Sequence, residues 1–581
     1  MRPRFAAGLI LGLLLVCTMT AGAPAATGGS LDTTFNPTGT PPGSVIAAMA
    51  PGTGADYFWD TAIQKDGKIV VAGEAEMGAN GTDVALARYN QNGTLDATFD
   101  TDGKATTDFS GTGGNDRAYA MLIQPDGKIV AAGMANTTGG DDDFGLARYN
   151  TDGSLDTAFG TGGLVTTSVA PGTNKDYAFA VAIQPDGKLV VAGGANVGGA
   201  TGWDSVVVRY NSDGTLDPAF GTGGKVVSAV SPGTDTDWWG SVAIQPDGKI
   251  VLAGKAGPAA NTTMSFARLT STGAADTSFG TAGFAMVDFP SGGQDGNWLG
   301  GLAVQPDGKI VSGGYASGEV AVARLNSNGT IDTTFNSTGT ATASLGGSTD
   351  QRGHDATLQT DGRIVIAADV FVGGIWTLGA ARFNSDGTLD TTFDGDGKVL
   401  TPVGDGTGSD AYSVALQRDG QIVVSGDAHT AAGEYDSALV RYNLGTYLYR
   451  SDAIINARGD DVYWQGQSAK VKVAEGTSKT VTIRVQNDGT SADRFMIHGS
   501  NSKGKARSAF AVSYWMGSRN ITREVTGGTY VTASVASGGA VTIAMKITAL
   551  GPSGHRTFNV TATSHGYAGS VDTVQAVVSI S

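Results

Sequence analysis

The chain has 581 residues, of which 89 are Gly, and its formal net charge is −16 at a sequence pI of about 4.7. Six of the 54 acidic residues are Glu, which leaves 48 Asp, and this excess of the turn residues Asp and Gly argues against long exposed helices. Because 40% of the residues are hydrophobic, the chain can form a packed core. The composition therefore excludes a coiled coil, collagen and full disorder, and the acidic pI argues against a nucleic-acid binder of the usual basic kind.

The first 25 residues have the pattern of a signal peptide. Arg2 and Arg4 precede an apolar run over 6–16, and Ala23-Pro24-Ala25 fits a small-residue cleavage site, with cleavage after Ala25. Later stretches stay shorter than the roughly 18 apolar residues of a membrane-spanning helix. The single cysteine, Cys17, leaves with this segment, so a disulfide or a Cys-ligated metal is not expected. The sequence predicts a secreted or cell-surface protein without membrane insertion after cleavage.

Three short motifs recur seven times over residues 26–446. The motif Gln-Pro-Asp-Gly-Lys-Ile-Val (124–130) places its turn Asp at positions 66, 126, 186, 247, 307, 361 and 419. The motif Ala-Arg-Tyr-Asn (87–90) places its Arg at 88, 148, 209, 268, 324, 382 and 441. The motif Leu-Asp-x-x-Phe (95–99) places its Asp at 32, 96, 156, 217, 276, 332 and 390. The period of about 60 residues is typical of a repeat architecture.

Each repeat has the pattern of four β-strands. In the third repeat, residues 178–184 alternate apolar and small or polar residues, an Asp-Gly turn follows, and 188–192 complete a hairpin. Two more strands are expected over 205–210 and 225–230. Four strands in each of seven repeats predict an all-β fold with a seven-bladed β-propeller, since a β-solenoid usually has shorter repeats.

The order of the motifs predicts how the ring closes. The first Leu-Asp-x-x-Phe, at 31–35, has no hairpin before it, and the last Arg-bearing strand, at 439–443, has no Leu-Asp-x-x-Phe after it. We therefore expect residues 30–50 to complete the seventh blade, and Asp32 to contact Arg441 as Asp96 contacts Arg88. Because the Arg–Asp pair recurs in every repeat, we interpret it as structural, holding a loop to its blade.

These motifs closely resemble the delta-60 repeat family over about residues 30–445. The resemblance implies a propeller on exported bacterial proteins, and it implies no reaction. Two blades depart from the pattern: Ala275 replaces the Leu in the fourth, and the sixth is shortened.

A second domain is predicted over residues 447–581, after the repeats end. Residues 481–485, 541–547 and 571–580 alternate apolar with polar positions, and turn sequences such as Asn487-Asp488-Gly489 separate them. About seven short strands fit an immunoglobulin-like β-sandwich without the cysteine pair of antibody domains. It looks like the sandwich modules appended to surface proteins, and its residues form no catalytic cluster in the sequence.

Aromatic residues near the loops into the first and third strands are the candidate ligand-binding residues. They are Trp59, Trp203, Trp238, Trp239, Trp298, Trp376, Tyr57 and Tyr177, together with His354. In this interpretation Trp59, Trp238 and Trp298 stand at positions equivalent to Tyr119, Phe179, His354 and Tyr412. Aromatic rings on a Gly-rich face suit stacking on sugars or clamping a peptide. The competing interpretation is packing between the blades.

A carboxylate stands ten residues before the turn Asp in each of the first four repeats, and it is the candidate metal ligand. The set is Asp56, Asp116, Asp176 and Asp237. A ring of these side chains at one mouth of the channel would suit Ca²⁺, which prefers oxygen ligands. The alternative, which the pattern favours, is that each Asp caps its strand through the backbone, and no other cofactor is expected.

The sequence points to binding more than to catalysis. His354 with Asp355 or Asp350 is the one candidate acid–base pair, and known hydrolase motifs do not occur. We therefore expect a monomeric, exported binding or scaffold protein whose propeller face holds an extracellular glycan or protein. The alternatives are a hydrolase or lyase that uses the channel mouth, and a structural spacer without a defined ligand.

Overall fold

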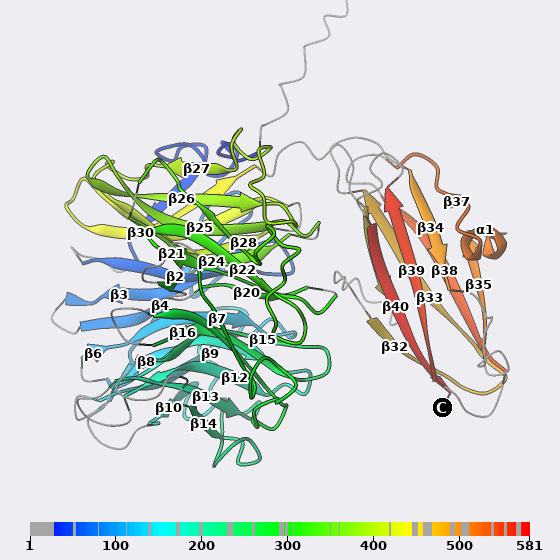
Figure 1. Ribbon diagram of the computed structural model, residues 1–581, viewed down its shortest axis with the longest axis horizontal. Coiled ribbons are helices and arrows are strands. Elements are labelled where there is room, and N and C mark those ends of the chain that lie inside the picture. Colours follow the sequence, from blue (N-terminus) through cyan, green and yellow to red (C-terminus); the bar gives the residue numbers. More distant parts are fainter. Residues whose placement is uncertain are drawn as a thin grey trace, which may run out of the picture.

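The structure is a computed structural model that describes residues 28–580, except for short gaps. These gaps are 50–53, 79–80, 112, 138–140, 170–174, 197–201, 229, 231–235, 258–261, 290–294, 297–299, 306, 349, 360, 418–419, 444–450, 457–467, 488–493, 501–509, 536–539, 551–554 and 565–570. The predicted signal peptide therefore lies outside the described residues. The rest forms seven four-stranded sheets, two of them with one extra short strand, followed by two five-stranded sheets (Figure 1).

The seven sheets are the blades of a propeller, and each of the first four follows the chain from its innermost to its outermost strand, as predicted. Blade 1 contains β2 (Asp56–Ile63), β3 (Ile69–Glu76), β4 (Gly81–Tyr89) and β5 (Lys104–Thr107), with β6 (Gly114–Asn115) beside β4. Blade 2 contains β7 (Arg117–Ile123), β8 (Ile129–Asn136), β9 (Asp142–Tyr149) and β10 (Leu164–Thr167). Blade 3 contains β11 (Asp176–Ile183), β12 (Leu189–Ala195), β13 (Asp204–Tyr210) and β14 (Lys225–Ser228). Blade 4 contains β15 (Trp238–Ile244), β16 (Ile250–Ala256), β17 (Thr263–Leu269) and β18 (Phe284–Val287).

The last three blades complete the ring with chain from both ends. Blade 5 contains β20 (Leu302–Val304), β21 (Ile310–Ala316), β22 (Glu319–Leu325) and β23 (Thr340–Ala343), with β19 (Asp295–Gly296) also on β21. Blade 6 contains β24 (Gln351–Leu358), β25 (Ile364–Val372), β26 (Ile375–Phe383) and β27 (Lys398–Thr401). Blade 7 contains β28 (Ser409–Leu416), β29 (Ile422–His429) and β30 (Tyr435–Tyr442), and β1 (Ser44–Ala47) is its fourth strand.

The closing contact predicted between Asp32 and Arg441 is present. The Arg441 guanidinium lies 2.6 Å from an Asp32 carboxyl oxygen, and Arg88 lies 2.6 Å from Asp96 in the same way. The guanidinium also lies over the ring of Phe35, at 4.7 Å. The Arg side chain also contacts the next blade. Arg88 Nη1 donates to the backbone oxygen of Thr151 in blade 2, and Arg441 Nη1 donates to that of Gln91 in blade 1. The pair therefore holds neighbouring blades together as well as its own loop.

The hydrophobic core of the propeller lies between blades. Seven clusters of buried apolar residues each draw on two adjacent blades, and the cluster between blades 7 and 1 combines Val423 and Leu439 with Phe58 and Ile69. Alternation along each strand explains this arrangement, because both faces of every inner strand pack on a neighbouring blade. The inner edge of each first strand has no neighbouring strand in its sheet and faces the central channel.

The C-terminal part is a sandwich with its own core. One sheet has the order β31 (Ser451–Asn456), β33 (Ser478–Asn487), β38 (Ala540–Ala549), β35 (Phe510–Met516) and β36 (Arg519–Asn520). The other has the order β32 (Ser468–Val473), β40 (Val571–Ile580), β39 (His555–Ser564), β34 (Phe495–Gly499) and β37 (Tyr530–Val531), and a short helix α1 spans Thr522–Thr526. Apolar residues of both sheets, among them Ile483, Met545 and Phe558, share one buried cluster. The last strand, β40, pairs parallel with β32 at the edge of the second sheet.

Candidate functional site

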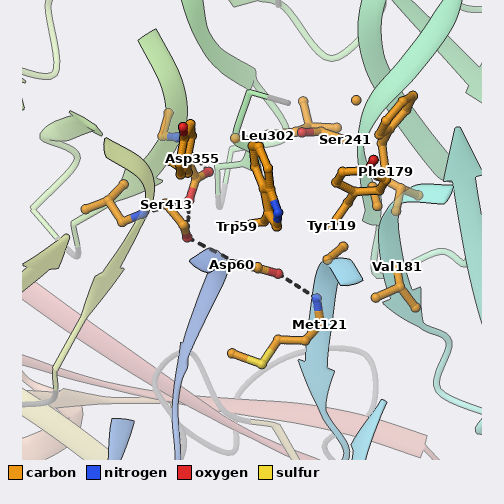
Figure 2. A pocket seen from close by; sticks show the side chains of 18 of the residues that line it. Trp59, Asp60, Tyr119, Met121, Phe179, Val181, Ser241, Leu302, Asp355 and Ser413 are labelled. Atoms are coloured by element: carbon orange, nitrogen blue, oxygen red, sulfur yellow. Dashed lines mark hydrogen bonds between the residues drawn. The ribbon is translucent and has the colours of Figure 1, made fainter. Parts of the chain in front are cut away.

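The first strands of the blades line a cavity of about 230 Å³ on the propeller axis. Its walls include Asp60 and Trp59 of β2, Met121 of β7, Ser241 of β15 and Ser413 of β28. Figure 2 shows Trp59 standing in the middle of this space, with Asp60, Asp355 and Ser413 on one side and Tyr119 and Phe179 on the other. The cavity is smaller than the roughly 300–1,000 Å³ of pockets for drug-sized ligands. It is suited to one ring or one side group of a larger ligand.

A β-bulge in the first strand aims one side chain of each blade at this cavity. In six blades the register between the first and second strands shifts by one residue, and the extra residue is Trp59, Tyr119, Phe179, Gly240, His354 or Tyr412. A bulge leaves its extra residue unpaired and re-aims the side chain. The corresponding part of blade 5, residues 297–299, lies outside the described residues.

The aromatic bulge residues contact one another in sequence around the channel. Ring centroids are 5.3 Å apart for His354 and Tyr412, 4.4 Å for Tyr412 and Trp59, and 5.7 Å for Trp59 and Tyr119. The series continues from Tyr119 to Phe179 at 5.4 Å and from Phe179 to Trp238 at 5.6 Å. We call these six residues the aromatic arc. Mutual contact holds the rings in place, so the arc is a preformed surface at the mouth of the channel.

The predicted equivalence of Trp238 with Trp59 is wrong by two residues. The bulge residue of blade 4 is Gly240, and Trp238 stands at the position of Tyr57 and Tyr177, opposite the second strand. Trp239 points to the other side of β15 and is 2% exposed in the cluster between blades 3 and 4. Trp239 is therefore a core residue and not a surface for a ligand, because successive side chains of a strand face opposite ways.

The remaining predicted aromatic residues surround the arc. Tyr177 lies 4.9 Å from the ring of Trp203, and Tyr57 lies 6.0 Å from Trp59. Trp376, at the β25–β26 hairpin, lies under the Arg352 guanidinium at 4.3 Å. All of these residues are half-buried. Trp298 lies outside the described residues.

The four candidate metal ligands are all engaged with the backbone. Their carboxylates are buried, and each accepts hydrogen bonds from backbone N–H groups. In Asp56, for example, one oxygen accepts from Met49 at 2.6 Å and the other from Glu76 at 3.2 Å. Asp116, Asp176 and Asp237 repeat the first of these contacts in their own blades. The residues tie the chain arriving from the preceding blade to the new strand, which is the capping alternative, and the Ca²⁺ ring is not supported.

Within the part of the chain that the structure describes, one acidic group is compact enough for a metal ion. Asp83, Asp108 and Asp116 bring three carboxylate oxygens within 4.8 Å of one another. Asp116 is engaged with the backbone as above, and one Asp108 oxygen accepts the N–H groups of Ser110 and Gly111, both at 2.8 Å. These contacts account for both residues as loop-forming side chains, and nothing beyond proximity points to an ion.

Two carboxyl groups that the sequence analysis did not select as a pair line the cavity. Asp60 of blade 1 and Asp355 of blade 6 are bridged by the Ser413 hydroxyl of blade 7, at 3.2 and 2.9 Å respectively (Figure 2). Asp60 also accepts the N–H of Met121 in blade 2 at 2.6 Å, and Asp355 accepts that of Val414 in blade 7 at 2.9 Å. The bridge thus links blades 6, 7, 1 and 2, on both sides of the blade that the chain ends share.

Blades 2 to 5 have no carboxyl group at the position equivalent to Asp60. The residues that correspond to Asp60 are Ala120, Ala180, Ser241 and Gly301 in blades 2 to 5. At Gly301 the blades approach so closely that an added Cβ would lie 2.0 Å from the backbone oxygen of Ala356. The signal for the bridge was therefore present in the sequence as a position that is acidic only in blades 1 and 6. It was missed because the bulge offsets this position from the simple alternation of the strand.

Burial is the main cause of the raised pKa values of the bridge. It raises the pKa of Asp60 to about 7, with the nearby Asp355 carboxylate adding to the effect, and it raises the pKa of Asp355 to about 6. Hydrogen bonds from the backbone and from Ser413 act in the opposite direction on both groups. Raised pKa values favour the protonated form in a site that water reaches poorly.

The predicted partner of His354 is wrong. Its Nε2 contacts the Asp369 carboxylate of β25, and not Asp355 or Asp350. His354 occupies the bulge of β24, so its side chain leaves the strand away from that of the next residue, Asp355. Both members of the new pair are buried, at 6% and 2% exposure. The histidine is part of the aromatic arc and is joined to an acidic second-strand residue.

A comparison with protein families identifies the repeats. The family described as "Domain of unknown function (DUF5122) beta-propeller" matches residues 64–99, 124–159, 184–220, 245–279, 305–335, 359–393 and 417–445. Each match runs from the end of a first strand to the Leu-Asp-x-x-Phe motif or, in blade 7, to the end of β30. Residues 64–445 therefore consist of DUF5122 β-propeller repeats, one for each of the seven blades.

Comparisons with individual proteins show less. No curated protein matches the sequence. Among solved structures, a polysaccharide lyase, Uly1, is 13% identical with a TM-score of 0.36, and the match covers 68% of this chain and 91% of that one. A glucose dehydrogenase is 14% identical (TM-score 0.30; 56% and 96% covered), and an endo-arabinase from Bacteroides thetaiotaomicron is 11% identical (TM-score 0.26; 55% and 91% covered). Within the described residues, the helices are too short to cross a membrane.

Proposed function

We propose that this protein is an exported, non-enzymatic binding protein whose propeller mouth holds a glycan. The observation that carries the proposal is the aromatic arc, in which six residues make five successive ring contacts. Four of them, Trp59, Tyr119, Phe179 and Tyr412, line a cavity of about 230 Å³ on the axis. Aromatic faces beside a small number of polar groups are suited to stacking on the apolar faces of sugar rings. Export is proposed from the sequence of residues 1–25.

A glycan suits this mouth better than a flat protein surface does. Apart from the buried His354, the rings of the arc are half-buried, and the cavity beside Trp59 has room for one ring of an oligosaccharide. Besides the Asp60–Ser413–Asp355 bridge, the wall carries Ser241 and Thr357, which are neutral hydroxyls of the kind that hydrogen-bond sugars. A protein ligand remains an outcome that the experiment below would reveal.

The bridge of Asp60 and Asp355 does not favour a hydrolase. All four carboxyl oxygens already accept hydrogen bonds: Asp60 from Thr61 and Met121, and Asp355 from Ala356 and Val414. A general acid or base must instead reach the proton that it moves. We therefore assign this pair to holding the blades together.

The test is binding of the mature full-length chain to an immobilised glycan panel, followed by titration calorimetry with the best glycan. Trp59→Ala and Trp238→Ala should each weaken binding, and the double variant should weaken it at least tenfold, a loss of about 1.4 kcal/mol. Trp515→Ala, which removes a half-buried ring of the sandwich strand β35, is the matched control and should bind like the unaltered chain. A panel without any bound glycan, or binding that the sandwich variant abolishes, would overturn the proposal.

A further inference from the structure

Charge is unevenly distributed around the mouth. In blade 1, Tyr57 follows the backbone-bound Asp56 and pairs with Glu74 of the second strand. The second-strand residues at this position, from blade 1 to blade 7, are Glu74, Met134, Gly194, Lys255, Tyr315, Asp369 and Asp427. Negative groups thus gather on blades 6, 7 and 1, and Lys255 stands on blade 4, with its ammonium 4.0 Å from the Trp238 ring. Glu74 is paired with Arg117 at 2.6 Å, which leaves blades 6 and 7 as the negative side.

Asp369, Asp410 and Asp427 form what we call the acidic sector. Asp369 is 2% and Asp427 is 0% exposed, while Asp410 is half-buried and outermost. Asp369 contacts His354, and Arg352 lies 4.0 Å away from it. Among the described residues, no Lys, Arg or His nitrogen lies within 4.0 Å of an Asp410 or Asp427 carboxyl oxygen. The sector therefore holds more negative groups than cations.

The carboxyl group of Asp427 is the most deeply buried of the three. Both of its oxygens, and one of Asp410, are buried and receive no hydrogen bond of good geometry within the described part of the chain. The nearby Tyr412 hydroxyl lowers the pKa of Asp427 somewhat, but burial and the Asp410 charge raise it well above its usual value. Burial likewise raises the pKa of Asp410 to about 6. A buried carboxylate of this kind needs either a proton or a cation from outside.

The spacing argues for an organic cation over a metal ion. Within the described part of the chain, these three carboxylates do not bring three oxygen atoms within 4.8 Å of one another. A Ca²⁺ ion holds its oxygens at about 2.3–2.6 Å, so its ligands must converge more closely than this. An ammonium group forms hydrogen bonds with carboxylates over longer spans, and its three N–H donors match several separate acceptors.

Aromatic rings next to the sector suit the same cation. Tyr412 and Trp59 are 4.4 Å apart, and Tyr57 stacks on Tyr435 at 6.4 Å. Burial is the main cause of the raised pKa of Tyr57, Tyr412 and Tyr435, and the Asp427 charge adds to it in all three. The Tyr412 hydroxyl also contacts that carboxyl group. The negative face of an aromatic ring attracts a cation, and Lys255 on the far side of the mouth would repel one.

We propose that the acidic sector binds the ammonium group of an amino sugar, so that the ligand of the mouth is a glycan with free amino groups. The inference rests on the proposed glycan binding and adds the chemical class of the glycan. The arc would stack on the sugar rings, Asp410 would receive the ammonium group, and the buried Asp427 behind it would add negative charge. The same ammonium chemistry occurs in lysine side chains, and the experiment separates the two sources.

The test compares three β-1,4-linked hexasaccharides that differ at C2, namely those of glucosamine, N-acetylglucosamine and glucose. Calorimetry with the mature full-length chain at pH 6 should show at least tenfold tighter binding of the glucosamine hexamer. In Asp427→Asn and Asp410→Asn the three hexamers should bind within about twofold of one another. Asp126→Asn removes the same charge from an exposed turn at the opposite ends of the strands, and it should keep the preference.

The outcomes separate the two proposals. Equal binding of all three hexamers that Trp59→Ala still weakens would overturn the amino-sugar inference and leave glycan binding intact. A hexalysine peptide that binds where the glucosamine hexamer does not would also overturn it and assign the sector to a protein ligand. Binding of no hexamer and of no other glycan would overturn both. Thermal melting checks folding of each variant, and Asp427→Asn should melt no lower than the unaltered chain, because it removes a buried charge.

Discussion

The two faces of the propeller are built from the same repeat but differ in what they keep constant. On the turn face, the same ion pair recurs in every blade at 2.6–2.8 Å, with a guanidinium over a Phe ring. On the mouth face, equivalent positions hold Trp59 in one blade and Gly240 in another. Constancy on one face holds the ring together, and this allows the other face to vary without loss of the fold.

The seventh blade sharpens this comparison, because it depends on both ends of the chain. Its outer strand β1 and Asp32 come from the first described residues. At the axis, the Asp60–Ser413–Asp355 bridge stands on both sides of the same blade. Closure of the ring therefore depends on contacts at the turn face and at the axis, and the predictions below measure how much each contact contributes.

Deletion of residues 26–50 from the mature chain should have the largest effect. It removes β1 and Asp32, which exposes the edge of β30 and leaves the buried Arg441 without its carboxylate. We expect aggregation in size-exclusion chromatography and loss of a cooperative thermal transition. A chain truncated after residue 446 keeps every propeller strand and serves as the control. A deletion variant that melts like the mature chain would show that the ring does not need this strand.

Adjacent tryptophans of β15 should respond very differently to truncation. Trp239→Ala leaves a cavity between blades 3 and 4 and should cost about 3–5 kcal/mol of unfolding free energy. Trp238→Ala, at the half-buried mouth, should cost about 1 kcal/mol or less. Denaturant unfolding of both variants measures the difference. Equal costs would mean that the mouth rings are core residues, and they would remove the main support for glycan binding.

Arg209→Ala should come next in size. The buried Asp217 would lose the guanidinium 2.7 Å away, and breaking a buried pair costs about 3–5 kcal/mol. We expect the lower end of this range, because Lys188 still lies 2.8 Å from Asp217. Lys175→Ala is the control on the mouth side, since the exposed Lys175 ammonium lies 3.9 Å from Asp142. A change below 1 kcal/mol for Arg209→Ala would contradict the structural role of the repeated pair.

The bridge at the axis should make stability depend on pH. The pKa of Asp60 is raised to about 7, so the folded state binds a proton that the unfolded state releases above about pH 4. This stabilisation is present at low pH and is lost as the pH rises toward 7. Relative to Asp60→Asn, the unaltered chain should lose about 1.4 kcal/mol for each unit of raised pKa over that range. Guanidinium unfolding at pH 4, 5.5 and 7.5 tests this, and parallel curves for the two proteins would refute it.

The local motifs determined the fold. The Asp-Gly turns, the alternation of the strands and the sevenfold period predict the blades, and the order of the motifs predicts the contact of Asp32 with Arg441. Each of these features depends on residues within one hairpin or on the count of repeats. The alternation after residue 446 likewise predicts two sheets with a shared core.

The site depended on tertiary structure. In six of the first strands, a bulge of one residue decides which side chain faces the channel, and it brings His354 to Asp369 in place of Asp355. In blade 4 the bulge residue is Gly240, and the preceding Trp239 lies in the core between blades 3 and 4. The acidic sector combines β25, β28 and β29 from two blades, and the bridge combines strands separated by more than 350 residues. Local patterns carry no information on such neighbours, because register shifts and contacts between blades are decided only when the ring closes.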